Sequence, residues 1–119
     1  MKPVLSLILA LGIAAQSSSQ QLSENQRENY IQRARQQLDA SCREGRLRKF
    51  ALKNNISGNA NFNITLGRNG NIETVFLVDS DITETSARNG LIMELSKVTL
   101  KEIPIPKKDR IKFSYHLTL

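Results

Sequence analysis

Cysteine and histidine occur once each in this 119-residue chain, and tryptophan is absent. One cysteine, Cys42, cannot form an internal disulfide. A hydrolytic triad needs histidine beside serine or cysteine with a carboxylate behind it, and a metal site needs several ligands at suitable spacing. His116 and Cys42 supply neither arrangement. The sequence therefore predicts a protein that is not an enzyme and has no catalytic residues, metal, cofactor or small-molecule substrate.

Aromatic residues are also few, with four Phe and two Tyr, so the core is expected to be mainly aliphatic. Charged residues make up 24% and hydrophobic residues 39% of the chain, which is ordinary for a globular domain. The length allows one domain.

The chain lacks an apolar run long enough to span a bilayer, which takes about 20 residues. Its longest such run, Val4 to Ala15, follows Lys2 and is followed by small residues. This pattern is typical of a signal peptide. We therefore predict a signal peptide over residues 1–17, cleaved between Ala14 and Ser17, a polar leader over 18–23 and a folded domain over 24–119. The alternative is a tethering or buried helix.

The formal net charge is +6, and part of the excess is clustered in Arg43, Arg46, Arg48, Lys49 and Lys53. Such a basic patch can bind nucleic acid or anionic lipid, or it can be a solvated helix end. Because only Phe50 is interleaved with these charges, the solvated helix end is favoured and nucleic acid is not expected as a partner.

A first helix is predicted after Ser23, which with Gln26 fits a capping box. Gly45 is a natural stop. The apolar residues between them recur at helical spacing: Tyr30, Ile31, Ala34, Leu38 and Cys42. Cys42 is therefore expected to be buried. The segment 46–57 has no clear periodicity, but four of its side chains are expected to pack onto the body: Leu47, Phe50, Leu52 and Ile56.

Two strands are predicted to form an antiparallel hairpin around Asn69-Gly70, a pair that tolerates positive φ. The strand 61–66 alternates apolar and polar residues. The strand 72–78 ends in a continuous apolar run, which predicts a central position in the sheet.

A second helix is indicated by Asp81-x-x-Glu84 and by the stripe Ala87, Leu91, Leu95 and Val98. Pro104 and Pro106 favour extended backbone. In the last strand, Ile111, Phe113, Tyr115, Leu117 and Leu119 face one way, and Lys112, Ser114, His116 and Thr118 face the other. The predicted fold class is α+β, in the order α-β-β-α-β, with a three-stranded antiparallel sheet and helices packed on one face.

Several segments taken in order resemble the C-terminal domain of TonB and TolA proteins: Ser57-Gly58 with the strand to Leu66, Asn69-Gly70-Asn71-Ile72 with the strand to Val78, Asp79-Ser80-Asp81 with the following helix, and Ile103-Pro104-Ile105-Pro106 with the closing strand. The resemblance covers roughly residues 25–119. Such domains are interaction modules of the Gram-negative periplasm that couple or hold envelope complexes, often by strand addition.

The resemblance implies a periplasmic, partner-binding protein whose docking edge is the last strand: Ile111, Lys112, Phe113, Ser114, Tyr115, His116 and Leu117. The partner would be an envelope protein such as an outer-membrane receptor, a Tol-like protein or a secretion component, with membrane contact only through partners. Without the membrane anchor and long spacer of full transducers, we expect an accessory subunit, adaptor or competitor.

Two alternatives remain. One is a component of an envelope-spanning secretion or conjugation machine, with the basic patch facing the assembly. The other is a eukaryotic secreted inhibitor or carrier, because Asn55-Ile56-Ser57 and Asn63-Ile64-Thr65 satisfy the N-glycosylation pattern. The oligomeric state is left open.

Overall fold

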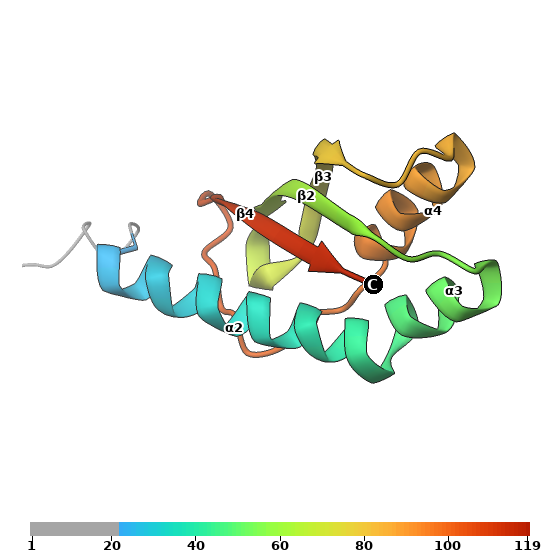
Figure 1. Cartoon of the computed structure of the whole chain (residues 1–119). Coiled ribbons are helices and arrows are strands. Elements are labelled where there is room, and N and C mark those ends of the chain that lie inside the picture. The colour runs from blue at the N-terminus through green and yellow to red at the C-terminus, as the bar shows by residue number, and fades with distance from the viewer. Residues whose placement is uncertain (1–21) are drawn as a thin grey trace, which may run out of the picture.

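The computed structural model describes residues 22–119, so the predicted signal peptide and most of the predicted leader lie outside the described residues. Its elements are, in order, α2 (Glu24–Glu44), α3 (Arg46–Asn54), β2 (Asn59–Leu66), the short 3₁₀ turn η2 (Arg68–Gly70), β3 (Ile72–Ser80), α4 (Thr85–Ser96) and β4 (Ile111–Thr118). An α+β fold with a three-stranded antiparallel sheet is thus confirmed (Figure 1). The predicted order omitted α3, so the order is α-α-β-β-α-β.

Helix α2 begins and ends where the sequence predicts. Gln26 N donates to Ser23 Oγ and Ser23 N donates to Gln26 Oε1, which completes the capping box. Gly45 is the C-cap residue, and its N–H donates to Ser41 O. Ala34, Leu38 and Cys42 are buried, so the predicted burial of Cys42 is confirmed.

Helix α3 is short, and its buried side is formed by Leu47 and Ala51. It ends at Asn55, whose φ of 57° is left-handed. Ile56 is buried beyond this end, but Leu52 is 69% exposed. The prediction that Leu52 packs onto the body was therefore wrong, because Leu52 lies on the opposite side of the helix from Leu47 and Ala51.

The strands lie in the order β3-β2-β4, so β2 is central and β3 is an edge. This contradicts the predicted central position of the 72–78 strand. Val75 and Leu77 are partly buried, whereas Phe76 and Val78 are exposed. The apolar run therefore lies on both faces of the sheet, and only one of these faces is covered.

The β2–β3 connection uses the residues that the hairpin prediction named. Asn69 has φ 59° and Gly70 has φ 80°. A Cβ atom at Gly70 would lie 2.8 Å from Ile103 Cβ, so this glycine also permits close packing against the segment before β4.

Helix α4 begins at Thr85, with Glu84 as N-cap, rather than directly after Asp81. Ala87, Leu91 and Leu95 are its buried residues, as the stripe predicts. Val98, the fourth residue of that stripe, lies beyond the end of the helix at Ser96 and is only partly buried. Gly90 lies under the ring of Phe50 on α3, and a Cβ there would overlap Phe50 Cζ. Glycine lowers the stability of a helix relative to alanine, but at this position it allows α3 and α4 to approach closely.

The segment between α4 and β4 runs along α2 and is held by side chains of that helix (Figure 1). Arg33 Nη1 donates to Glu102 O at 2.6 Å. Gln37 Nε2 donates to Lys101 O and Lys101 N donates to Gln37 Oε1, both at 2.8 Å. These contacts place the turn before β4 beside the beginning of α2, where Arg27 Nη1 donates to Arg110 O.

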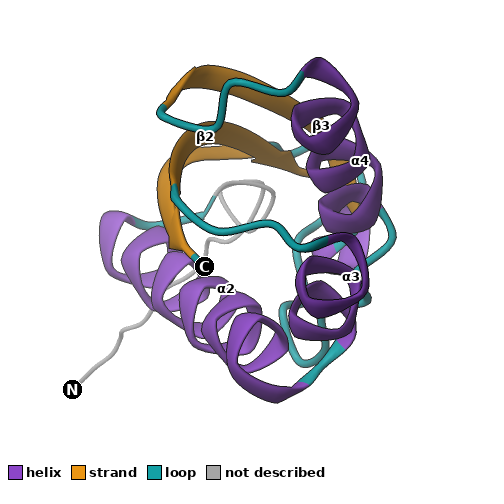
Figure 2. Ribbon diagram, turned by 45° about the vertical axis from the view of Figure 1, so that its right-hand side comes forward, coloured by secondary structure: helices purple, strands orange, loops and turns teal. Residues whose placement is uncertain are grey.

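The hydrophobic core lies between one face of the sheet and the three helices, which lie on the same side of the curved sheet in Figure 2. β2 contributes Ala60, Phe62, Ile64 and Leu66, and β4 contributes Ile111, Phe113, Tyr115 and Leu117. The buried side chains of residues 22–119 all come from the segment between Ala34 and Leu117. Leu22, which precedes α2, is partly buried and packs against this core.

Candidate functional site

Strand β4 has the most regular free edge of the sheet. Its register with β2 runs without a bulge from Asn59↔Thr118 to Leu66↔Ile111. Just beyond it, Gly58 and Leu119 exchange two backbone hydrogen bonds of 3.1 and 2.9 Å. Hydrogen-bonded pairs alternate along an antiparallel ladder. The backbone groups of Lys112, Ser114, His116 and Thr118 therefore point away from β2.

Strand β3 is one residue longer than β4, but its pairing with β2 is less regular. Its register with β2 shifts between Asn61 and Phe62 and again between Thr65 and Leu66. Only the segment 74–77 lies in regular register between these two irregularities. Bulges and short edges oppose the addition of a further strand, so β4 is the better template.

The β4 edge is flanked by two charged side chains of α2. Arg35 Nη2 donates to Ser114 O at 2.9 Å, and the Arg35 guanidinium lies 5.8 Å from the centroid of the Phe113 ring. Asp39 lies one turn further along α2 and accepts a hydrogen bond from Tyr115 Oη at 2.7 Å. Together with Ser114, Tyr115 and His116, these two residues line a cavity of about 260 Å³ beside the edge.

A polar pair inside the core connects β4 with α2. Cys42 Sγ lies 3.5 Å from Tyr115 Oη. Burial raises the pKa of the Cys42 thiol. Burial, together with the hydrogen bonds to Cys42 and Asp39, raises the pKa of Tyr115 far above its usual range. Both groups are therefore neutral at physiological pH, and they fix the position of β4 on the helix.

The uncovered face of the sheet carries cross-strand polar pairs. His116 Nδ1 lies 2.6 Å from Asn61 Oδ1, and Asn61 Nδ2 donates to Asp79 Oδ1 at 2.7 Å. His116 is thus engaged with β2 on this face. Asn63 lies on the same face and is exposed, as the glycosylation alternative requires.

Asp81 closes the end of the hairpin. Its Oδ1 accepts from Asn59 N at 2.8 Å and its Oδ2 accepts from Asn59 Nδ2 at 3.2 Å. The backbone hydrogen bond from Asn59 is the main cause that lowers the pKa of Asp81 below its usual value of 3.8. The Asp81 carboxylate therefore binds the beginning of β2 and does not cap α4.

We expect Asp81→Ala to lower the urea midpoint of unfolding near neutral pH. A carboxyl group whose pKa is lower in the folded state stabilises the fold above its unfolded pKa, and this stabilisation is lost as the pH falls through the folded pKa. The difference between wild type and Asp81→Ala should therefore shrink between about pH 5 and pH 2. A difference that is constant over this range would show that the Asp81 charge is not the cause.

The structure divides the five residues of the predicted basic patch. Arg46, Lys49 and Lys53 line a cavity of about 380 Å³ together with Phe50 and Glu94. Arg48 instead donates from Nε to Cys42 O at 2.9 Å and so satisfies a carbonyl at the end of α2. Arg43 is exposed in the last turn of α2.

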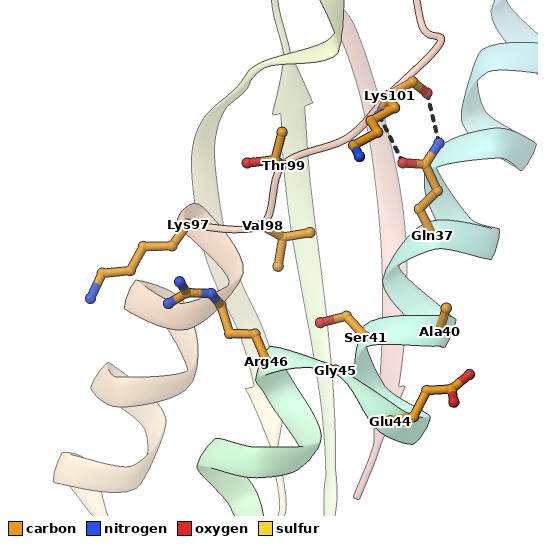
Figure 3. Close-up of a pocket in the computed structure, with 10 residues that line it drawn as sticks. All are labelled: Gln37, Ala40, Ser41, Glu44, Gly45, Arg46, Lys97, Val98, Thr99 and Lys101. Carbon is orange, nitrogen blue, oxygen red and sulfur yellow. Dashed lines mark hydrogen bonds between the residues drawn. The ribbon is translucent and has the colours of Figure 1, made fainter.

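A groove with a volume of about 500 Å³ lies between α2, the start of α3 and the segment after α4 (Figure 3). The paired hydrogen bonds between Gln37 and the Lys101 backbone close one end of it. Arg46 and Lys97 reach the same side of the groove from α3 and from the end of α4. Most of the residues that line it are polar or charged.

Within residues 22–119, no helix is both long and apolar enough to cross a membrane, and no group of three or more His, Cys, Asp or Glu is placed to hold a metal ion. No family model, no curated protein and no solved structure matches this chain.

Proposed function

We propose that this protein is an exported interaction module of the Gram-negative periplasm that binds an envelope protein by strand addition to β4. The observation that carries the proposal is the unbroken β4 edge, with the backbone groups of four alternating residues directed away from β2. Main-chain hydrogen bonds to such an edge supply affinity, and side-chain pockets beside it supply specificity.

The order of hairpin, helix, proline segment and closing strand supports the further proposal that the module is similar to the C-terminal domains of TonB and TolA. The apolar run Val4 to Ala15 supports export. The partner would be an outer-membrane receptor, a Tol-like protein or a secretion component.

Arg35 sets a condition on this binding. Its guanidinium donates a hydrogen bond to Ser114 O, which an incoming strand needs as an acceptor. Binding therefore requires Arg35 to turn away, and the cavity beside Ser114 and Asp39 offers space for a side chain of the incoming strand.

We expect Ser114→Pro to abolish partner binding and Ser114→Ala to retain it. Proline removes the outward N–H, while the bonds of the neighbouring residues to β2 are unaffected. Alanine removes the same side chain but keeps the N–H. The full chain is expressed in a Gram-negative host, recovered from the periplasmic fraction and used to capture partners from envelope extract.

The third variant in this series is Val75→Pro, which makes the same change on the free edge of β3. It should bind as wild type does, and circular dichroism confirms the fold of each variant. Equal capture by folded Ser114→Pro and Ser114→Ala would contradict addition to β4. Loss of capture only in Val75→Pro would assign docking to β3.

A further inference from the structure

Four cations surround one carboxylate on the outer side of α3 and α4. Arg46, Lys49 and Lys53 are spaced by three and four residues, so they share one side of α3. Arg46 Nη1 lies 3.0 Å from Glu94 Oε1, and Lys97 Nζ lies 3.8 Å from Glu94 Oε2. The α3–α4 surface, as we call these five residues, therefore has a net positive charge that one glutamate does not neutralise.

Two of these cations are available to a partner. Lys49 and Lys53 are exposed and form no ion pair with any residue of the segment 22–119. They line the 380 Å³ cavity together with the half-buried Phe50. By contrast, Arg46 and Lys97 are held in place by Glu94.

Exposed apolar side chains flank the same surface. Leu52, three residues after Lys49, is 69% exposed, and Met93 is 59% exposed. Met93 follows Gly90 by three residues, and Gly90 packs against Phe50, so Met93 lies at the outer side of the α3–α4 contact. Cations beside exposed apolar side chains are typical of surfaces that bind at a membrane interface.

We infer that the α3–α4 surface binds the anionic headgroup layer of a phospholipid bilayer, with Leu52 and Met93 entering its outer part. Lysine and arginine near an anionic membrane surface are attracted to it individually and additively. Single-stranded nucleic acid would instead require exposed aromatic rings on which bases stack, and the ring on this surface, Phe50, is half-buried. This direct contact goes beyond the proposed function, and it differs from the expectation that partners alone provide membrane contact.

The test uses a chain from Ser18 to Leu119, which contains every described element and the whole core, so that the apolar run Val4 to Ala15 cannot insert. Its partition coefficient is measured by co-sedimentation with vesicles of phosphatidylcholine alone and of phosphatidylcholine with phosphatidylglycerol. The test variant is Lys49→Glu/Lys53→Glu. The matched control is Lys107→Glu/Lys108→Glu, which makes the same charge change in the turn before β4.

The control site lies at the opposite end of α2 from α3 (Figure 1). With a rise of 1.5 Å per residue, the segment of α2 from Arg27 to Arg43 alone separates them by about 24 Å. A surface-specific effect can therefore be distinguished from an effect of net charge.

The expected result is binding to the phosphatidylglycerol vesicles that falls about tenfold or more in Lys49→Glu/Lys53→Glu and changes little in the control. Leu52→Ser/Met93→Ser, which keeps the charge, should bind more weakly and lose the part of the binding that persists at high salt. Equal losses in the two charge variants would overturn the inference. Unchanged binding of the Leu52→Ser/Met93→Ser variant, or tighter binding to single-stranded DNA than to the vesicles, would overturn it as well.

Discussion

Phe62→Ala is expected to destabilise the domain by about 3–5 kcal/mol, whereas Phe76→Ala is expected to change its stability by no more than about 0.5 kcal/mol. Phe62 is 1% exposed at the centre of β2, and Phe76 is 67% exposed on the neighbouring β3. Removal of the Phe62 ring leaves a cavity between the sheet and the helices. Removal of the Phe76 ring leaves none.

The measurement is the free energy of unfolding from urea titrations followed by circular dichroism. The two substitutions delete the same atoms from adjacent strands, so propensity effects largely cancel. Small domains are stable by only about 5–15 kcal/mol, so Phe62→Leu is measured beside Phe62→Ala and should give a smaller loss of the same sign. Comparable losses for the two alanine variants would mean that both faces of the sheet are covered. This result would contradict the exposure of the face that carries Phe76.

Much of the fold could be predicted from local sequence patterns. Ser23 and Gln26 marked the start of α2, and the alternation in 61–66 and 111–117 assigned the buried face of β2 and β4 correctly. These features succeed because each is determined by neighbours within four residues along the chain. The positive φ at Asn69 and Gly70 is equally local.

The order of the strands in the sheet could not be predicted from local sequence patterns. An apolar run such as the one from Val75 to Val78 fits a strand buried on both faces, but it also fits an edge strand with two exposed apolar side chains. Which of these holds depends on whether a second layer covers the sheet, and that is a property of the whole chain. α3 was missed because only Leu47 and Ala51 form its buried side.

The candidate docking edge was predicted as a strand, but its surroundings were not. Arg35 lies outside the apolar stripe that predicted α2, yet its guanidinium donates to Ser114 O, 79 positions further along the chain. Similarly, Asp81 was interpreted as a helix start and instead binds Asn59. Hydrogen bonds from side chains to distant backbone groups leave no periodic signal, so sequence patterns do not reveal what occupies an edge.

Gly58→Ala is the second substitution with a large expected effect. Gly58 joins the α3 region to β2 with φ 133°, and an alanine Cβ there would lie 2.5 Å from Asp81 Oδ1 and 2.9 Å from Ile82 Cγ1. Backbone strain of this kind costs about 1–3 kcal/mol, and the overlap with Ile82 adds to it. We therefore expect the free energy of unfolding to fall by about 2–4 kcal/mol.

The double variant Gly58→Ala/Asp81→Ala separates the two causes. If overlap with the Asp81 carboxylate dominates, the double variant should lose less free energy of unfolding than the two single variants lose together. If backbone strain dominates, the two losses should be additive. Because Gly58 exchanges both backbone hydrogen bonds with Leu119, its substitution should also loosen the end of β4. This would appear as an increase in amide exchange relative to wild type that is larger at Leu119 and Leu117 than at Phe113. An unchanged stability of Gly58→Ala would refute the constrained turn, and with it the role of Gly58 in holding the proposed docking strand in register.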